Sequence, residues 1–292
     1  MLPAPEQRQN MITRLNSNDR VKQTSTWKDN IPVFRVNNCF ELNQMIGYAR
    51  FLNADAGTVL FRGQDDLYPD LLPSAMRSTE IENKQNVDNL ERNLASALSN
   101  PHFIKFVFSS NRGKSPALTW DYYQKETLES LFQHYGAKTR AIDFVDTVWP
   151  ALWFAKNGSS DPNKNAYIFL YVADTEKTSI HGLYISDESI TIDLRKAFSS
   201  LFLRPAAQHG WTVKTRKYCP LKYHLTRVVA VLEIPIKSID EMLGTGLLLT
   251  GKNFYPNPSI DKGYEYLLHN QKNSSIPNNH MKCIFSEGFF PE

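Results

Sequence analysis

The 292-residue sequence predicts an α+β fold with a central mixed or antiparallel sheet and flanking helices. Helical and extended patterns follow one another without the strict alternation of a parallel α/β sheet. Residues 166–173 form a run too continuously apolar for an exposed strand, which places the run in the centre of the sheet. Residues 227–235 have a second strong strand pattern. No internal repeat or low-complexity linker divides the chain.

The bulk composition is that of an ordinary globular protein: 41% of the residues are hydrophobic, 22% are charged and the net charge is +3. The three cysteines are sparse and lack CxxC spacing, which favours a reducing compartment over a disulfide framework. No apolar run is long enough to span a bilayer, and the first residues lack the apolar segment of a signal peptide. We therefore expect a soluble, cytoplasmic protein without membrane contact.

The domain organisation expected from the sequence is simple. Residues 1–36 are polar with weak periodicity, so they should form an N-terminal arm, with a short strand at its end, before one domain over 37–292. Asn38 and Glu41 have the spacing of a capping box, and apolar residues follow them at helical spacing. Two later helical patterns form a helical insertion over about 79–135.

The insertion should contain one helix over about 79–108 and a firmer one over about 119–135. Asp146 or Thr147 can cap a further helix that carries Pro150 in its first turn. The remaining short elements are strands at 182–186 and 191–194 and helices at 238–243 and 263–269.

A short apolar run at 59–61 ends in Arg62, Gly63 and Gln64. An arginine at the end of a buried strand is unfavourable unless its guanidinium meets an anion or a set of carbonyls. The glycine behind it lets another backbone or a ligand approach closely. Arg62 is therefore either part of a binding site or a member of a structural salt bridge. Arg77 is a second arginine that should lie close to Arg62.

Polar residues also gather at 133–143, where a helix ends and a strand begins, and at 203–212. The first cluster combines an amide, an imidazole, a phenol, a guanidinium and a carboxylate. Helix ends are common places for ligand groups and for perturbed ionisation. Both segments are candidate parts of a site.

These motifs, in this order, resemble the FRG domain family, named for the triplet seen here as Phe61-Arg62-Gly63. The resemblance spans roughly residues 37–268. Its further blocks are Leu72-Pro73-Ser74 with Arg77, Gln133-His134-Tyr135-Gly136, Thr139-Arg140, Asp143, Ala151 with Phe154-Ala155, and Arg204, Gln208 and Gly210. Phe144 stands where the family commonly has tryptophan, and Lys138 where it commonly has proline.

More remotely, the order of these elements is similar to the ADP-ribosyltransferase fold, which cleaves NAD and transfers ADP-ribose. The similarity implies that Arg62 grips the pyrophosphate or ribose of NAD and that His134 and Tyr135 lie on the nicotinamide side. It implies that Gln208 contacts the ribose, at a position where the fold often has a glutamate. The other implied NAD contacts are Gly63, Gln64, Arg77, Thr139, Arg140 and Arg204.

Gln208 in place of a glutamate affects whether the site can catalyse NAD cleavage. An amide carries no charge to offset an oxocarbenium-like cation, so either another acid serves or the domain binds a nucleotide without efficient turnover. Asp143 and Glu233 are the alternative acids, and Asp143 is favoured because it belongs to the most distinctive block. The candidate catalytic residues are thus Gln208, Asp143 and His134.

The resemblance implies an NAD-using, ADP-ribosyltransferase-like effector of bacterial anti-phage defence or toxin type, acting on an unknown macromolecular acceptor. The alternative is a non-catalytic module that binds nucleic acid or protein. Basic residues alternate with aromatic ones after Trp211, a pattern that suits a nucleic-acid backbone with stacked bases. Lys214, Arg216 and Lys217 are the candidate nucleic-acid contacts.

A third alternative is a buried ion network of Arg62, Asp143 and Arg140 that holds no ligand. No metal site is predicted, because His269, His280 and Cys283 do not have zinc-ligand spacing.

Overall fold

The computed structural model describes residues 12–108, 117–158, 161–175, 181–216, 222–244 and 247–273. Within these ranges the chain has the expected α+β architecture, built on one nine-stranded sheet in the order β1-β2-β9-β5-β3-β4-β8-β7-β6. The strands are β1 (Gln23–Trp27), β2 (Ile31–Arg35), β3 (Thr58–Gln64), β4 (Ile142–Val145), β5 (Asn165–Ala173), β6 (Leu183–Ile185), β7 (Ser189–Asp193), β8 (Gly210–Thr215) and β9 (Val228–Pro235). The sheet is mixed, since β2 and β9 are parallel and the other neighbours are antiparallel.

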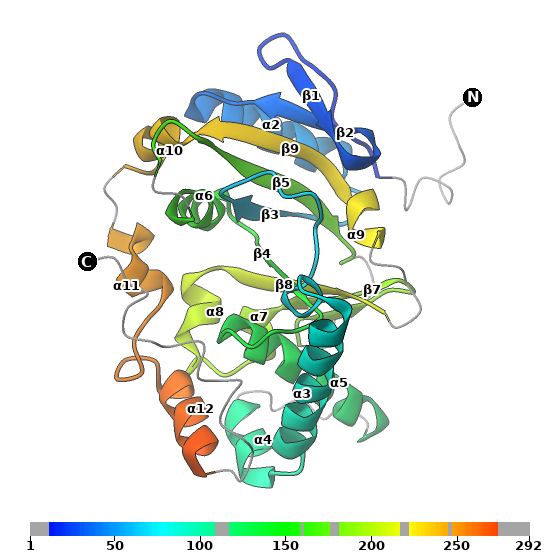
Figure 1. The fold of residues 1–292 in the computed structure, drawn as a ribbon, viewed down its shortest axis with the longest axis vertical. Helices are drawn as coiled ribbons and strands as arrows, with labels where there is room; N and C mark the ends of the chain where they lie inside the picture. The colour runs from blue at the N-terminus through cyan, green and yellow to red at the C-terminus, as the bar shows by residue number, and fades with distance from the viewer. Residues whose placement is uncertain are drawn as a thin grey trace.

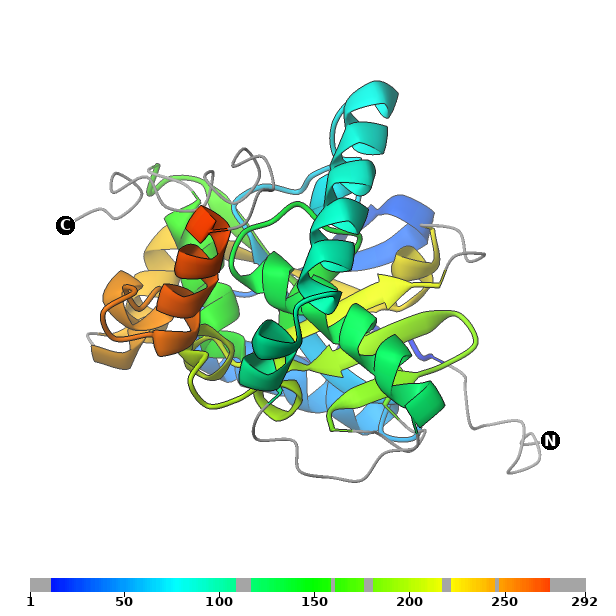
Figure 2. The same cartoon turned by 90° about the horizontal axis from the view of Figure 1, so that it is seen from below.

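Helices pack around this sheet in two groups (Figure 1). One group lies with the β2-β9-β5-β3 half of the sheet: α2 (Cys39–Leu52), α6 (Val148–Asn157) and α10 (Ile236–Leu243). The other lies with the β8-β7 half: α3 (Glu80–Leu98), α4 (Pro101–Val107), α5 (Ala117–His134), α7 (Leu194–Ala197), α8 (Leu203–Ala207) and α12 (Lys262–Asn273). Two short helices, α9 (Tyr223–Thr226) and α11 (Gly251–Phe254), complete the set. In the second group, α12 packs on α4, where the Phe106 and Tyr266 rings stack with centroids 3.7 Å apart. Both helices lie towards the viewer when the molecule is seen from below (Figure 2).

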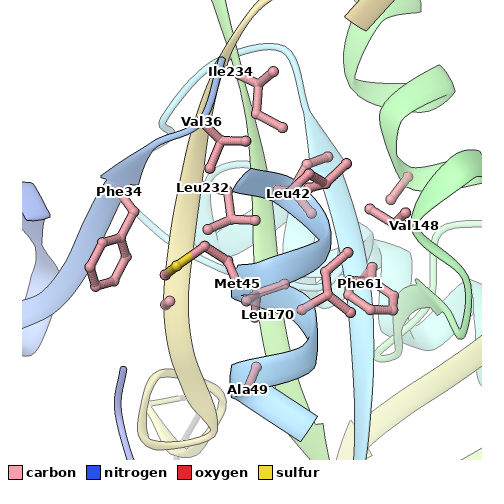
Figure 3. Close-up of a cluster of buried hydrophobic side chains, with 14 of the residues drawn as sticks. Phe34, Val36, Leu42, Met45, Ala49, Phe61, Val148, Leu170, Leu232 and Ile234 are labelled. Carbon is pink, nitrogen blue, oxygen red and sulfur yellow. The ribbon is translucent and has the colours of Figure 1, made fainter. Parts of the chain in front are cut away.

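The largest core cluster lies under α2. The Asn38 side chain caps this helix by accepting hydrogen bonds from the backbone N–H groups of Phe40 and Glu41. Leu42 and Met45 then face the sheet, where they meet Leu170 of β5 and its neighbours (Figure 3). The capping signal and the apolar spacing read from the sequence are confirmed here.

The two halves of the sheet join between β3 and β4. β3 pairs with β5 at every residue from Thr58 to Gln64, but it pairs with β4 only through Phe61 and Val145. The helix α6 packs on one face of β3. It approaches so closely that a Cβ on Gly63 would lie 1.9 Å from the carbonyl oxygen of Ala151. A glycine is required there because only a residue without a side chain leaves room for the helix backbone.

Several elements differ from the sequence-based expectation. The segment expected to be an arm with a short strand at its end contributes β1 to the sheet as well as that strand, β2, and the buried Leu15 donates its backbone N–H to the carbonyl of Val229. The expected helix over 79–108 is two helices, because Asn100 caps a new helix whose first residue is Pro101. β8 was not predicted at all, since its polar residues hid the strand pattern.

The outer strands of the sheet are short or polar. β1 is exposed along most of its length, and its register with β2 shifts between Gln23 and Ser25. At the other edge, β6 has three residues and pairs with β7. In the described ranges no helix combines the length and the apolar character needed to cross a membrane.

We expect Gly63→Ala to destabilise the protein, because the added Cβ would force α6 away from β3. The free energy of unfolding should fall by about 2–3 kcal/mol in urea denaturation. Gly47→Ala is the matched control, since a Cβ at this position in α2 meets no atom within 4 Å. That control should gain roughly 0.5–1 kcal/mol from helix propensity. Wild-type stability of Gly63→Ala would contradict the close packing of α6 on β3.

Candidate functional site

Arg62 lies where β3 and β4 separate. Its Nη1 donates a 2.8 Å hydrogen bond to the backbone carbonyl of Asp143 in β4. The guanidinium therefore satisfies a carbonyl that the diverging strands leave without a β3 partner. The Nε of Arg62 is buried and has no hydrogen-bond partner in the described part of the chain.

Asp143 faces the end of α5. Its Oδ2 accepts a 2.6 Å hydrogen bond from Nε2 of Gln133, and its Oδ1 lies 3.8 Å from Nδ1 of His134. Burial alone would raise the pKa of Asp143, but His134, Gln133 and Arg62 outweigh it and lower the pKa. The carboxylate is thus held ionised. Oδ1 of Asp143 and Nε2 of His134 are buried without a hydrogen-bond partner among the described residues.

The residues behind Gln133 fix its orientation. Its Oε1 accepts hydrogen bonds from the Ser74 hydroxyl, at 3.3 Å, and from the Thr139 hydroxyl. Ser74 in turn accepts a 3.0 Å hydrogen bond from the backbone N–H of Thr139. Thr139, an expected NAD contact, is fully buried, and its hydroxyl holds Gln133. No role is predicted from the sequence for Gln133 or Ser74, although both belong to the motif blocks.

Arg77 adds a second positive charge near Arg62. Burial and, next, the charge of Arg77 lower the pKa of Arg62 to about 10, while Asp143 acts in the opposite direction. Nε of Arg77 donates to the carbonyl of Leu72 at 2.9 Å. Two guanidinium groups therefore share one carboxylate in this region. Gln64 ends β3 beside them with a buried Oε1 that has no partner in the described ranges.

Three of the expected site residues tie α8 to the C-terminal segment. The Arg204 guanidinium lies 4.9, 5.2 and 4.9 Å from the ring centroids of Tyr135, Tyr255 and Tyr264. The Tyr135 hydroxyl donates to Asp261 at 2.5 Å, and Nε2 of Gln208 donates to the carbonyl of Phe254 at 2.6 Å. Tyr135, Arg204 and Gln208 are all buried. Their geometry is that of a packed aromatic cluster.

This aromatic cluster borders the Arg62–Asp143 region. Burial raises the pKa of Tyr255, and the nearby charge of Asp143 raises it further, against the effect of Arg204. His134 also packs against β8, where a Cβ on Gly210 would lie 2.5 Å from the imidazole. The structure thus brings Arg62, Asp143 and His134 together, and places Tyr135, Arg204 and Gln208 in the adjoining cluster.

Arg140 belongs to a different arrangement, a buried ion cluster with Lys214. Arg140 donates to Oε1 and Oε2 of Glu129 at 3.1 and 2.7 Å and pairs with Glu91 at 2.7 Å. Lys214 pairs with Glu129 at 2.9 Å and with Glu126. The carboxylates that pair with Arg140 are thus Glu91 of α3 and Glu129 of α5, and Asp143 is not among its ion-pair partners in the described part of the chain.

The structure places the expected nucleic-acid contacts in different environments. Lys214 lies in β8, its side chain is 12% exposed, and the two glutamates of α5 neutralise it. Arg216 is exposed and donates to the carbonyl of Ser186 at 3.1 Å. Lys217 lies outside the described residues. The spacing of basic and aromatic residues in the sequence does not show that Lys214 meets the glutamates of α5.

The part of the chain that the structure describes contains no group of three or more His, Cys, Asp or Glu side chains arranged to hold a metal ion. His280 and Cys283 lie outside that part.

Glu129→Gln should lower the free energy of unfolding by about 3 kcal/mol at pH 7, because Lys214 and Arg140 would keep their charges in a buried position without this carboxylate. The comparison is made by urea denaturation. Glu265→Gln removes an exposed glutamate paired with Lys262 and should change the stability by less than about 1 kcal/mol.

Glu129→Gln should also make the free energy of unfolding depend less on pH in the acid range. Burial would raise the pKa of Glu129, but Lys214 and Arg140 lower it to about 2. Because the folded-state pKa lies below the unfolded value of roughly 4.3, the contribution is fully present above that value and is lost as the pH falls towards 2. Urea midpoints measured from pH 7 to about pH 3 should fall more steeply for wild type than for Glu129→Gln. Parallel curves would show that Glu129 does not carry this dependence.

Comparisons with curated proteins and with solved structures give no match to this chain. The scan against family models gives a match to the FRG domain over residues 57–164. That range contains β3, β4 and α6, and so includes Phe61-Arg62-Gly63, the Gln133–Tyr135 block and Asp143. The resemblance to the FRG domain read from the sequence is confirmed over these residues.

Proposed function

We propose that NAD binds where β3 and β4 separate and that this protein is an ADP-ribosyltransferase-like effector of the bacterial defence or toxin type. The observation that carries the proposal is the set of buried, unsatisfied polar atoms on Arg62, Asp143 and His134. Unsatisfied buried groups are uncommon in native proteins, and their grouping marks a place where a polar ligand supplies hydrogen bonds.

Charge supports a nucleotide as that ligand. Arg62 and Arg77 repel one another, and Asp143 is the carboxylate that acts on both. His224 adds no further positive charge, because burial and the charge of Arg62 lower its pKa to about 4 and keep it neutral at pH 7. A diphosphate would accept hydrogen bonds from the guanidinium groups and neutralise their excess charge.

The same contacts favour Asp143 as the acid that stabilises the transition state of NAD cleavage. Cleavage of NAD releases nicotinamide and leaves positive charge on the ribose, which an ionised carboxylate in a buried site stabilises. Asp143 is held ionised by His134 and Gln133, whereas the Gln208 amide already donates to Phe254. We therefore assign the electrostatic role to Asp143 and the positioning of Asp143 to His134. Glu233, the other acid considered, hydrogen-bonds Asn165 at 2.6 Å.

The other residues expected around NAD take supporting roles in the proposal. Thr139 and Ser74 orient Gln133, and Gly63 brings α6 against β3. Tyr135 and Arg204 form the wall beside Tyr255. The acceptor of ADP-ribose is a macromolecule outside this site.

Asp143→Asn should slow nicotinamide release from NAD by roughly 100-fold, because it removes the charge that stabilises the ribosyl cation. Its affinity for NAD should stay within a few-fold of wild type. Arg77→Gln should weaken NAD binding about tenfold, by loss of one charged hydrogen bond. Release is measured by chromatography with and without cell lysate as acceptor, and binding by calorimetry.

Asp88→Asn, an exposed substitution on α3, is the matched control for the loss of a carboxylate. Wild-type protein that neither binds NAD nor releases nicotinamide would overturn the proposal. Binding without release, unchanged in Asp143→Asn, would leave NAD as a ligand and reject the enzyme assignment.

A further inference from the structure

A cavity of about 540 Å³ opens at the other end of β3 from Gln64. It lies between the start of β3, the end of β4, the start of α6 and the turn before β8. Its lining includes Arg50, Asp146, Thr147, Arg195 and His209. The volume falls within the range of roughly 300–1,000 Å³ typical of small-molecule sites. The proposed NAD site uses none of these residues.

Asp146 organises one wall of the cavity. Its Oδ2 accepts from Nε1 of Trp211 at 3.2 Å and from Nη2 of Arg195, and its Oδ1 lies 3.2 Å from Nδ1 of His209. Burial would raise the pKa of Asp146, but His209, Arg195 and Trp211 lower it to about 2. The carboxylate is therefore already occupied, and it serves to hold Arg195 and His209 in place.

Arg195 is fixed from two sides. Its Nε donates to Oδ1 of the fully buried Asp193 at 3.0 Å, in addition to its pair with Asp146. Lys196 shares Asp193 at 3.3 Å. Arg50 also belongs to this group. The positive charges of Arg50, Arg195 and Lys196 therefore outnumber the two carboxylates of Asp146 and Asp193.

Arg50 is the least neutralised of these groups. Nη2 of Arg50 donates to the backbone carbonyl of Asp146 at 3.1 Å, and the guanidinium lies 5.5 Å from the Phe61 ring centroid. Among the described residues no carboxylate pairs with it. The side chain is thus held over the cavity with donors left for an anion.

The N-terminus of α6 supplies further donors. Thr147 is the N-cap residue, but its side chain makes no capping hydrogen bond. The first N–H groups of this ten-residue helix therefore lack a side-chain cap at the edge of the cavity. His209 completes the wall: Nδ1 contacts Asp146, so Nε2 is the ring nitrogen left for a ligand.

We propose that this cavity binds the phosphate group of a small phosphorylated molecule. Arg50, the first N–H groups of α6 and the His209 imidazole bind the phosphate, Arg195 holds His209 in place through a 3.3 Å contact between Nη1 and Nδ1, and the rest of the cavity holds the organic part. The site is distinct from the proposed NAD site, because it shares no lining residue with that site and three residues of β3, roughly 10 Å, separate Val59 from Arg62.

The test is calorimetric titration of the full chain with inorganic phosphate, ribose 5-phosphate and AMP. We expect the phosphate esters to bind at least tenfold more tightly than inorganic phosphate, since the cavity is larger than a phosphate ion. Arg50→Gln should weaken all three about tenfold by removing one charged group.

His209→Asn is the second variant and should weaken binding several-fold. His209 has φ 53°, in the left-handed region that asparagine also tolerates, so the backbone should be retained. Arg20→Gln, an exposed substitution, should bind as wild type. The absence of phosphate binding by wild type would overturn the proposal.

A second result would also overturn it: binding that is kept in Arg50→Gln and His209→Asn but lost in Arg77→Gln. The ion would then lie beside Arg62, at the proposed NAD site. Tighter binding of inorganic phosphate than of both esters would reject a small organic phosphate as the ligand.

Discussion

The contact between the α6 backbone and β3 at Gly63 is the constraint on which the rest of the structure depends. Three consecutive residues of β3 meet three different requirements. Phe61 packs in the core with α2 and α6, Arg62 reaches the Asp143 carbonyl, and Gly63 admits the helix. Because β3 is fully paired on one side and nearly unpaired on the other, the Phe-Arg-Gly triplet sets how the two halves of the sheet meet. The family signature is therefore explained by packing before any ligand is considered.

The three arginines that the motifs treated alike differ in their partners. Arg62 meets a backbone carbonyl and keeps a buried donor unsatisfied, Arg140 meets two carboxylates, and Arg204 meets three tyrosine rings. An arginine whose charge is neutralised by carboxylates gains little free energy from binding an anion. An arginine that lies among other cations gains more. Partner chemistry, which motif spacing does not contain, separates an arginine that stabilises the fold from one that can bind a ligand.

Much of the fold was predictable because it rests on local signals. The cap and apolar spacing of α2, the helix ending at Gly136 and the apolar runs of β5 and β9 all follow from neighbouring residues. β8 and the environment of Lys214 were less predictable, since β8 pairs with β4 residues 65–71 positions earlier and Lys214 pairs with glutamates 85 and 88 positions earlier. The cavity around Asp146 was missed for the same reason: Arg50, Arg195 and His209 are distant in sequence and meet only after the sheet forms.

The strands at the two ends of the sheet also bear on how the protein behaves at high concentration. A long, flat outer strand offers its backbone groups to a neighbouring molecule, and natural proteins suppress this with short, polar or irregular edges. Here β1 is polar and exposed with a shifted register, and β6 is three residues long. Both edge strands therefore disfavour pairing with strands of other copies of the protein, so the nine-stranded sheet does not extend from one molecule to the next.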